Sequence, residues 1–276
     1  MTVLKPQSME PDAEASEVAG RASQAGADSQ AGAGLTVEIL YPEFGNQAGA
    51  NGNEMYLRAC LPGARFVDKQ YDDEPAFARE RVSLVIMGGM SEFQQEIVIK
   101  RLRPWRDELA ACVERGVPML FCGNAPEILG RAIIRPDGSR VEGLGILDCV
   151  ARQETPKRFT GLFAGVFEPG GGADPIRIAG FKAQFTQVEG DNAGCGFCSV
   201  KNGFGLAEGG AVEGYRKRNL IATWLIGPVL PENPPLARWL LDAAGAAEAP
   251  LAFEDVAMRA YEARVKAAFT PGAEMV

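Results

Sequence analysis

The 276-residue chain contains no histidine. Histidine is the side chain that most often moves a proton near neutral pH, and its imidazole is a common zinc ligand. Its absence excludes every cysteine–histidine catalytic pair and every zinc site that uses imidazole. A catalytic cysteine in this chain would therefore have to act without its usual base.

Long apolar runs and an excess of basic charge are also missing. No run approaches the roughly 18–20 apolar residues that a membrane span requires, and the first residues lack the basic and apolar regions of a secretory signal. Lys and Arg number 28 against 36 Asp and Glu, which gives a net charge of −8. This acidic balance argues against non-specific nucleic-acid binding. We expect a soluble cytoplasmic protein with no membrane span and no nucleic-acid partner.

Cysteine is present, but not in the pattern of a disulfide scaffold. The six cysteines are scattered through a mid-sized chain, which favours reduced thiols. Cys195 and Cys198 form one CxxC pair, which supplies two metal ligands where a structural zinc site needs four. The pair lies in a Gly-rich stretch, so we interpret it as two ordinary thiols and expect neither a metal nor another cofactor.

The composition divides the chain into three parts. Residues 1–34 are rich in Ala, Gly, Ser, Gln and Glu without apolar periodicity, which predicts a disordered N-terminal tail. Residues 35–245 alternate between short apolar runs and helical patterns and form the expected folded domain. Residues 246–276 are expected to form a C-terminal helical extension, with an amphipathic helix from Phe253 to Phe269.

Apolar runs separated by helical patterns predict the fold class. A helix is expected from Ser91, a potential N-cap, and Pro104 should kink or divide it. The Gly-rich stretch from 161 to 214 indicates antiparallel strands and loops. Strand–helix alternation predicts an α/β fold, with a mostly parallel sheet between two layers of helices. The alternating run "LTVEILYP" (35–42) is expected to form the first strand. The runs expected to form buried strands are "RVSLVIMGG" (81–89), "VPMLF" (117–121) and "NLIATWLIG" (219–227).

The stretch "VPMLFCGNAPEILG" (117–130) places Cys122 between a strand and a helix start. Such an elbow presents a side chain at the sheet edge, and the helix N-terminus is expected to favour the thiolate. Gly123 lets the turn close. The pattern fits a nucleophile, and it fits equally a buried structural cysteine.

Gly88 and Gly89 end the preceding predicted strand. Backbone N–H groups at this position can hold an oxyanion, because small residues allow a close approach. An ordinary turn at the end of a strand explains the same two glycines.

Four stretches, in this order, resemble the GatD family, the glutamine amidotransferase subunits of lipid II isoglutaminyl synthase. "LYPEFGNQAGANGNEMYL" resembles the opening of that family, and "MGGMSEFQQE" resembles its GGGQD-x-EQ loop. "CGNAPEILG", followed by "EGLGILD", is similar to CGGYQ-LLG followed by GLGLLD. "NLIATWLIGPVLPENPPLA" is similar to N-x-IGTYLHGPLLP-x-NP. The resemblance runs from about Leu35 to Asp242.

The resemblance implies a fold and a role. The family has the class I, CobB/CobQ-like amidotransferase fold, a flavodoxin-like three-layer α/β/α arrangement. Its members hydrolyse glutamine and pass ammonia to a Mur ligase-like (MurT-type) partner, which amidates the glutamate of the peptidoglycan stem. By position Cys122 corresponds to the nucleophile, and the amides of Gly89 and Gly123 to the oxyanion site. Arg158 lies where the family has an arginine near the substrate carboxylate. A heterodimer with such a ligase subunit is therefore expected.

The departures from the family cluster at the expected site. Ile226 occupies the position of the family histidine, and isoleucine cannot transfer a proton. The glutamine of CGGYQ is lost, with Pro126 or Glu127 near its place. Met90 and Ser91 replace two residues of the GGGQD loop.

Three interpretations follow from these departures. The chain could be a glutaminase with altered machinery, in which Glu127 is a conceivable replacement base, although an ordinary carboxyl pKa suits a thiol poorly. It could be a pseudo-glutaminase that keeps the fold and stabilises or regulates the ligase partner. A stand-alone thiol sensor at Cys122 is the third interpretation.

Overall fold

The structure, a computed structural model, describes residues 30–270 and residue 272. Its central sheet has six strands in the order β13-β14-β4-β3-β1-β2. The five strands other than β13 are parallel, and β13 pairs antiparallel at one edge. Counted along the chain, the parallel strands have the flavodoxin-like order 2-1-3-4-5. The strands are β1 (Thr36–Leu40), β2 (Arg65–Lys69), β3 (Leu84–Met87), β4 (Met119–Phe121), β13 (Tyr215–Lys217) and β14 (Leu220–Ala222).

Helices cover both faces of this sheet, because successive residues of its buried strands point to opposite sides. On β3, Val85 and Met87 join a core that includes α3, α4 and α5. Leu84 and Ile86 join a second core that includes α2, α6 and α7. The predicted three-layer α/β/α fold with a mostly parallel sheet is thus confirmed. These helices are α2 (Asn51–Cys60), α3 (Glu92–Leu102), α4 (Arg106–Glu114), α5 (Pro126–Leu129), α6 (Val229–Glu232) and α7 (Pro234–Ala243).

The helix expected from Ser91 begins as predicted. The Ser91 hydroxyl accepts a hydrogen bond from the Gln94 N–H at 3.3 Å, and the Gln94 side chain accepts one from the Ser91 N–H at 2.9 Å. This capping box satisfies backbone donors that the first turn leaves unpaired. Pro104 divides the helical stretch as expected. Among the described residues, three short 3-10 helices of one turn each are η1 (Gln47–Gly49), η2 (Ala76–Ala78) and η3 (Arg103–Trp105).

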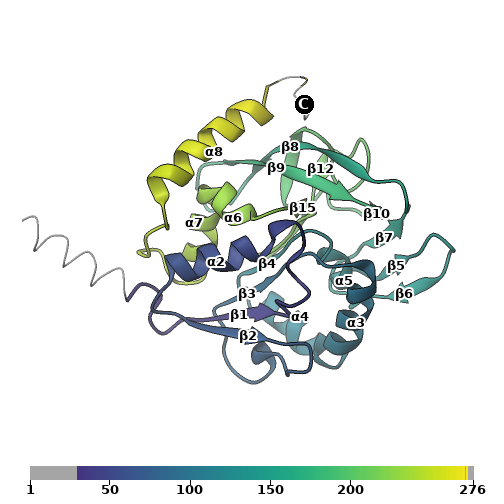
Figure 1. Ribbon diagram of the computed structural model, residues 1–276, viewed down its shortest axis with the longest axis horizontal. Coiled ribbons are helices and arrows are strands. Elements are labelled where there is room, and N and C mark those ends of the chain that lie inside the picture. Colours follow the sequence, from purple (N-terminus) through teal and green to yellow (C-terminus); the bar gives the residue numbers. More distant parts are fainter. Residues whose placement is uncertain (1–29, 271, 273–276) are drawn as a thin grey trace, which may run out of the picture.

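Two further sheets have the orders β10-β7-β5-β6 and β12-β11-β8-β9-β15. The Gly-rich stretch 161–214 contributes antiparallel strands to both, as predicted, whereas β5 and β7 pair in parallel. Figure 1 shows β8 and β9 above the parallel sheet, with α8 (Glu254–Ala268, yellow) along their outer side. The strands are β5 (Ala132–Ile134), β6 (Arg140–Glu142), β7 (Val150–Gln153), β8 (Phe159–Phe167), β9 (Ile176–Gln184), β10 (Thr186–Glu189), β11 (Cys198–Asn202), β12 (Val212–Glu213) and β15 (Leu225–Ile226).

One predicted strand was wrong in its extent. The run "NLIATWLIG" is two short strands that belong to different sheets, β14 beside β4 and β15 beside β9. The chain leaves the parallel sheet at Thr223 and Trp224, where the Glu213 carboxylate accepts hydrogen bonds from the Thr223 hydroxyl and the Trp224 N–H, both at 2.8 Å. Apolar composition alone carries no signal for that change of partner.

The structure describes only part of the two terminal segments that the composition predicts. Of the tail predicted over residues 1–34, only 30–34 are described, and there the Ala31 carbonyl accepts a hydrogen bond from the Gly63 N–H at 2.9 Å. In the C-terminal extension, α8 packs on β8 and β9 through Tyr261, Val265 and Ala268. No helix within the described residues is long and apolar enough to cross a lipid bilayer.

Candidate active site

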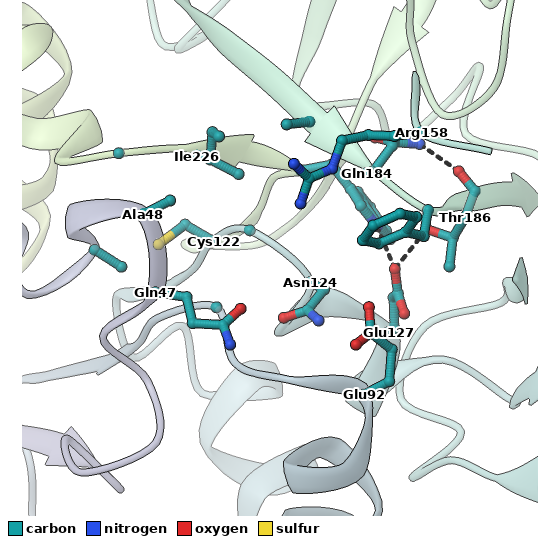
Figure 2. A pocket seen from close by; sticks show the side chains of 17 residues that line it. Gln47, Ala48, Glu92, Cys122, Asn124, Glu127, Arg158, Gln184, Thr186 and Ile226 are labelled. Atoms are coloured by element: carbon teal, nitrogen blue, oxygen red, sulfur yellow. Dashed lines mark hydrogen bonds between the residues drawn. The ribbon is translucent and has the colours of Figure 1, made fainter. Parts of the chain in front are cut away.

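A cavity of about 320 Å³ lies at the carboxyl ends of the parallel strands. Segments after β1, β3, β4 and β14 form one side, and segments of the antiparallel strands form the other (Figure 2). This is the edge at which α/β sheets of this order bind ligands. Six of the residues singled out from the sequence meet at this cavity: Gly89, Cys122, Gly123, Glu127, Arg158 and Ile226.

Cys122 follows β4, as predicted, but its thiol is withdrawn from solvent. The residue has 0% exposure, and its Sγ lies 3.7 Å from the Asn53 Nδ2 and 3.8 Å from the Met87 carbonyl oxygen. Burial raises the pKa of Cys122 to about 12, and a hydrogen bond from the Gly89 N–H only partly opposes that rise. The expected stabilisation of the thiolate is therefore not observed, since desolvation of a charged sulfur dominates.

The turn after β4 differs from that of a strained nucleophile. In a nucleophile elbow the reactive residue itself occupies the sharp turn. Here the left-handed conformation falls on Gly123, at φ +67°, and Cys122 is absent from the described non-glycine residues with positive φ. The Gly123 N–H donates to the Leu225 carbonyl at 2.9 Å. That amide, expected at the oxyanion site, is engaged within the protein.

Gly88 and Gly89 have different surroundings. A Cβ on Gly88 would lie 2.0 Å from the Gly45 carbonyl oxygen, so close packing of two loops requires glycine there. Gly88 does not line the cavity, whereas Gly89 does. Of the amides predicted for an oxyanion, the Gly89 N–H is therefore the one that faces Cys122.

Ile226 and Arg158 approach the cavity from the antiparallel sheet. Ile226 pairs with Phe181 of β9, and Figure 2 shows it at the same end of the cavity as Cys122. Arg158 precedes β8 and places its guanidinium over the Phe185 ring, 4.6 Å from the ring centroid. At the thiol end of the cavity the side chain of Ile226 is aliphatic and carries no proton. The guanidinium of Arg158 lies further along the cavity.

Glu127 is the most strongly bonded acid of the cavity. Its carboxylate accepts hydrogen bonds from the Thr186 hydroxyl at 2.6 Å, the Trp224 indole at 3.1 Å and the Gln95 amide at 3.0 Å. Burial raises the pKa of Glu127, and these three donors oppose that rise. Among the described residues, none of its hydrogen bonds reaches Cys122, so this geometry does not make it the base of the thiol.

Several residues of this network were not identified from the sequence. The Asn124 side chain bonds both backbone groups of Met90, at 2.8 and 2.7 Å, and holds the loop after β3 against the turn after β4. The Gln95 amide also donates to the Asn124 carbonyl at 2.8 Å. Trp224 could have been identified from the sequence, because a tryptophan in an apolar run is expected to be buried and its indole N–H then needs a hydrogen-bond acceptor.

A buried ion pair lies behind the cavity and was also missed. The Lys182 ammonium lies 2.5 Å from the Glu213 carboxylate and donates to the Gly205 carbonyl at 2.6 Å. Burial lowers the pKa of Lys182, and the neighbouring Glu213 opposes that change. Since Glu213 also accepts from Thr223 and Trp224, the pair anchors the segment that leads into β15.

The remaining cysteines lie outside this cavity. Cys195 is exposed, whereas Cys198 begins β11 and is buried. All six cysteines are free thiols. Within the part of the chain that the structure describes, no group of three or more cysteine or acidic side chains is placed to hold a metal ion.

Comparison with known proteins gives matches along most of the described chain. Residues 60–234 match the CobB/CobQ-like glutamine amidotransferase domain family. The chain is 31% identical over 165 residues to subunit GatD of the glutamine-hydrolysing lipid II isoglutaminyl synthase of Staphylococcus aureus, covering 60% of this chain and 65% of that subunit. It is 25% identical over 221 residues to the corresponding GatD subunit of Streptococcus pneumoniae, covering 76% and 80%.

A more distant similarity extends to a larger protein. The chain is 28% identical over 174 residues to cobyric acid synthase of Rhodobacter capsulatus, covering 60% of this chain and 35% of that enzyme. The first GatD alignment likewise spans slightly less than two thirds of the staphylococcal subunit. The similarity thus concerns one domain, and the matched residues 60–234 include most of the residues that line the cavity.

Proposed function

The chain belongs to the CobB/CobQ-like glutamine amidotransferase family, and on this premise we propose that it is a non-hydrolysing, GatD-like subunit of a lipid II isoglutaminyl synthase-type complex. In this role the domain stabilises or regulates a Mur ligase-like (MurT-type) partner in a heterodimer. The partner uses free ammonia to amidate the glutamate of the peptidoglycan stem. The observation that carries the proposal is the buried Cys122 thiol with an aliphatic residue, Ile226, at its end of the cavity.

The chemistry of glutamine hydrolysis explains why this observation is decisive for the proposal. Attack on the glutamine amide needs a thiolate, and burial raises the pKa of Cys122 to about 12, so the neutral thiol dominates at pH 7. The departing ammonia also needs a proton, and no imidazole exists in the chain. Loss of one member of a nucleophile–base pair costs on the order of 10⁴ to 10⁶ in rate.

Similarity to two GatD subunits supports the ligase partner. Both relatives are named as subunits of a glutamine-hydrolysing lipid II isoglutaminyl synthase. In this chain the scaffold of the domain is kept while the reactive groups are changed. A domain that retains its fold without a competent thiol is suited to binding and assembly. An active glutaminase is the alternative, supported by the Gly89 amide that faces Cys122.

Co-purification with the ligase partner tests the proposal. The chain is co-expressed with the Mur ligase-like protein of its own genome, and glutamate release from glutamine is measured beside ammonia-dependent ligase activity. We expect a stable complex, ligase activity with ammonia, and no glutamate release above that of Cys122→Ala. Cys60→Ala, which alters another buried thiol, controls for effects on folding.

Two results would contradict the proposal. Cys122-dependent glutamate release at the rates of ordinary amidotransferases would identify an active glutaminase. Failure of the two proteins to associate, with the chain folded, would remove the role as a ligase subunit.

A further inference from the structure

The C-terminal helix α8 has two apolar faces, and the described residues cover only one of them. Tyr261, Val265 and Ala268 form the first face and pack on the antiparallel strands β8 and β9. The second face is exposed, and Figure 1 shows α8 on the outer side of these strands. This face, which we call the outer seam, consists of Phe253, Val256, Ala260, Ala263 and Ala267.

The outer seam has the spacing of a contact between two helices. Its residues recur alternately every three and four positions, which aligns its helical members along one side of α8. Phe253, at the N-cap, is 77% exposed and Val256 is 61% exposed, although large apolar side chains are usually buried. Phe253 also has a φ of +55°, which is uncommon for a bulky residue. A regular apolar face with these exposures indicates a partner helix.

The sizes of its side chains favour an antiparallel pair of α8 helices. Large residues occupy the N-terminal half of the outer seam and alanines occupy the C-terminal half. When two copies lie antiparallel with Ala260 at the centre, Val256 of each copy meets Ala263 of the other. Phe253 of each copy then comes to Ala267 of the other. Each large side chain packs against a small one, whereas a parallel pair would place large residues together and leave gaps between the alanines.

The charges beside the outer seam favour the same arrangement. One row of exposed side chains along it contains Asp255, Arg259, Glu262 and Lys266. Within the described residues none of the four forms an ion pair. In the antiparallel pair this row lies beside the same row of the second copy, so Asp255 meets Lys266 of the other helix. Arg259 likewise meets Glu262, and every contact of the two rows joins opposite charges.

From these two features we infer that the chain forms a homodimer about a two-fold axis at Ala260, with α8 packed antiparallel on α8 of a second copy. The surface is self-complementary in both size and charge, as a two-fold interface requires. Helix α8 lies outside the matched residues 60–234. None of the residues of the outer seam lines the cavity that contains Cys122, so the inference does not depend on the chemistry of that cavity.

Sedimentation equilibrium of the full chain tests the inference. We expect a reversible monomer–dimer equilibrium within about 1–300 µM, because a single pair of helices buries less surface than a standard interface. Ala260→Glu places two carboxylates at the axis and should raise the dimer Kd at least about tenfold. Ala193→Glu adds the same charge to an exposed alanine outside α8 and should leave the Kd unchanged. Thermal unfolding followed by circular dichroism checks that each variant is folded.

Charge reversal tests whether the partner is a second copy in this orientation. Arg259→Glu places a carboxylate against Glu262 of the other helix, and Glu262→Arg places a guanidinium against Arg259. Each variant alone should raise the dimer Kd at least about tenfold, because both symmetric contacts then join like charges. In an equimolar mixture of the two variants every such contact again joins opposite charges. The mixture should therefore dimerise with a Kd within about threefold of the wild-type value.

Three results would overturn the inference. A folded wild-type chain that stays monomeric throughout the concentration range does not pair through α8. A dimer that Ala260→Glu leaves unchanged uses another surface. Loss of the dimer in both charge variants without recovery in their mixture excludes the antiparallel pairing of the two rows.

Discussion

The two ends of the cavity use burial in opposite ways. At the thiol end, Cys122 belongs to an apolar cluster, and burial suppresses the ionisation on which a nucleophile depends. At the carboxylate end, Glu127 is equally buried, but Gln95, Thr186 and Trp224 donate hydrogen bonds to it. A buried polar group is retained at the second end because its partners are present. Burial thus disfavours ionisation at the thiol end, whereas three hydrogen-bond donors partly offset its effect at the carboxylate end.

The largest effect is expected from breaking the carboxylate end. Glu127→Ala would leave the Thr186 hydroxyl, the Trp224 indole and the Gln95 amide without their acceptor, and should lower the free energy of unfolding by about 3–5 kcal/mol. Urea denaturation measures this loss. Glu127→Gln keeps one oxygen for Thr186 and Trp224 and should cost about 1–2 kcal/mol. Because glutamine also keeps the volume of the side chain, equal losses for the two variants would mean that the oxygen it retains for Thr186 and Trp224 contributes little to stability.

The stability of the carboxylate end should depend on pH. Because burial raises the pKa of Glu127 in the folded protein, the folded state binds this proton more tightly than the unfolded chain does. Its contribution to stability is full below the unfolded pKa near 4.5 and declines as pH rises above that value. The stability of the wild type relative to Glu127→Gln should therefore fall between pH 4.5 and pH 8 in urea titrations.

An exposed glutamate provides the control for that slope. Glu142→Gln changes an acid on the surface, where Arg140 lowers the pKa of the carboxyl. Relative to this variant the wild type should not lose stability as pH rises over the same window. A flat difference between the wild type and Glu127→Gln would contradict the raised pKa of Glu127.

A smaller effect is expected at the thiol end. Cys122→Ala removes one buried sulfur from an apolar cluster and leaves no strong hydrogen bond unmet, so the free energy of unfolding should fall by about 1–2 kcal/mol. Urea denaturation of Cys122→Ala and Glu127→Ala under the same conditions compares the two losses in the free energy of unfolding. A loss as large as that of Glu127→Ala would show that the thiol end is also held by polar interactions.

The smallest effect is expected from adding an imidazole at the thiol end. Ile226→His places an imidazole at the same end of the cavity as Cys122 but leaves Cys122 buried and the Gly123 amide bonded to Leu225. Glutamate release from glutamine should stay at the level of Cys122→Ala. Hydrolysis that depends on both Cys122 and the new imidazole would show that burial of the thiol does not prevent its reaction.

Much of the fold was predictable because its signals are local. The continuous apolar run of β3 reflects burial on both faces, and the capping box at Ser91 involves residues three positions apart. The family resemblance inferred from four motifs is confirmed by the match over residues 60–234. The division of the run 219–227 into β14 and β15 was missed, because it depends on Glu213, which the local pattern does not reveal.

The structure brings together three of the residues predicted for the candidate site, because Cys122, Ile226 and Arg158 line one cavity. The partners of Glu127 come from α3, β10 and the segment before β15, so only folding brings them together. The pair of Lys182 and Glu213 is likewise formed between residues 31 positions apart in the chain.

By itself the sequence determined what chemistry the chain can possess. The absence of histidine removes imidazole from every site, and the order of apolar runs specifies a parallel sheet with ligand-binding loops at one edge. Tertiary structure alone decided how the remaining groups behave. Burial sets the pKa of Cys122, and distant donors make Glu127 a bonded acid instead of a base. Hydration and long-range contacts arise only when separate segments meet, and they govern ionisation more strongly than residue type does.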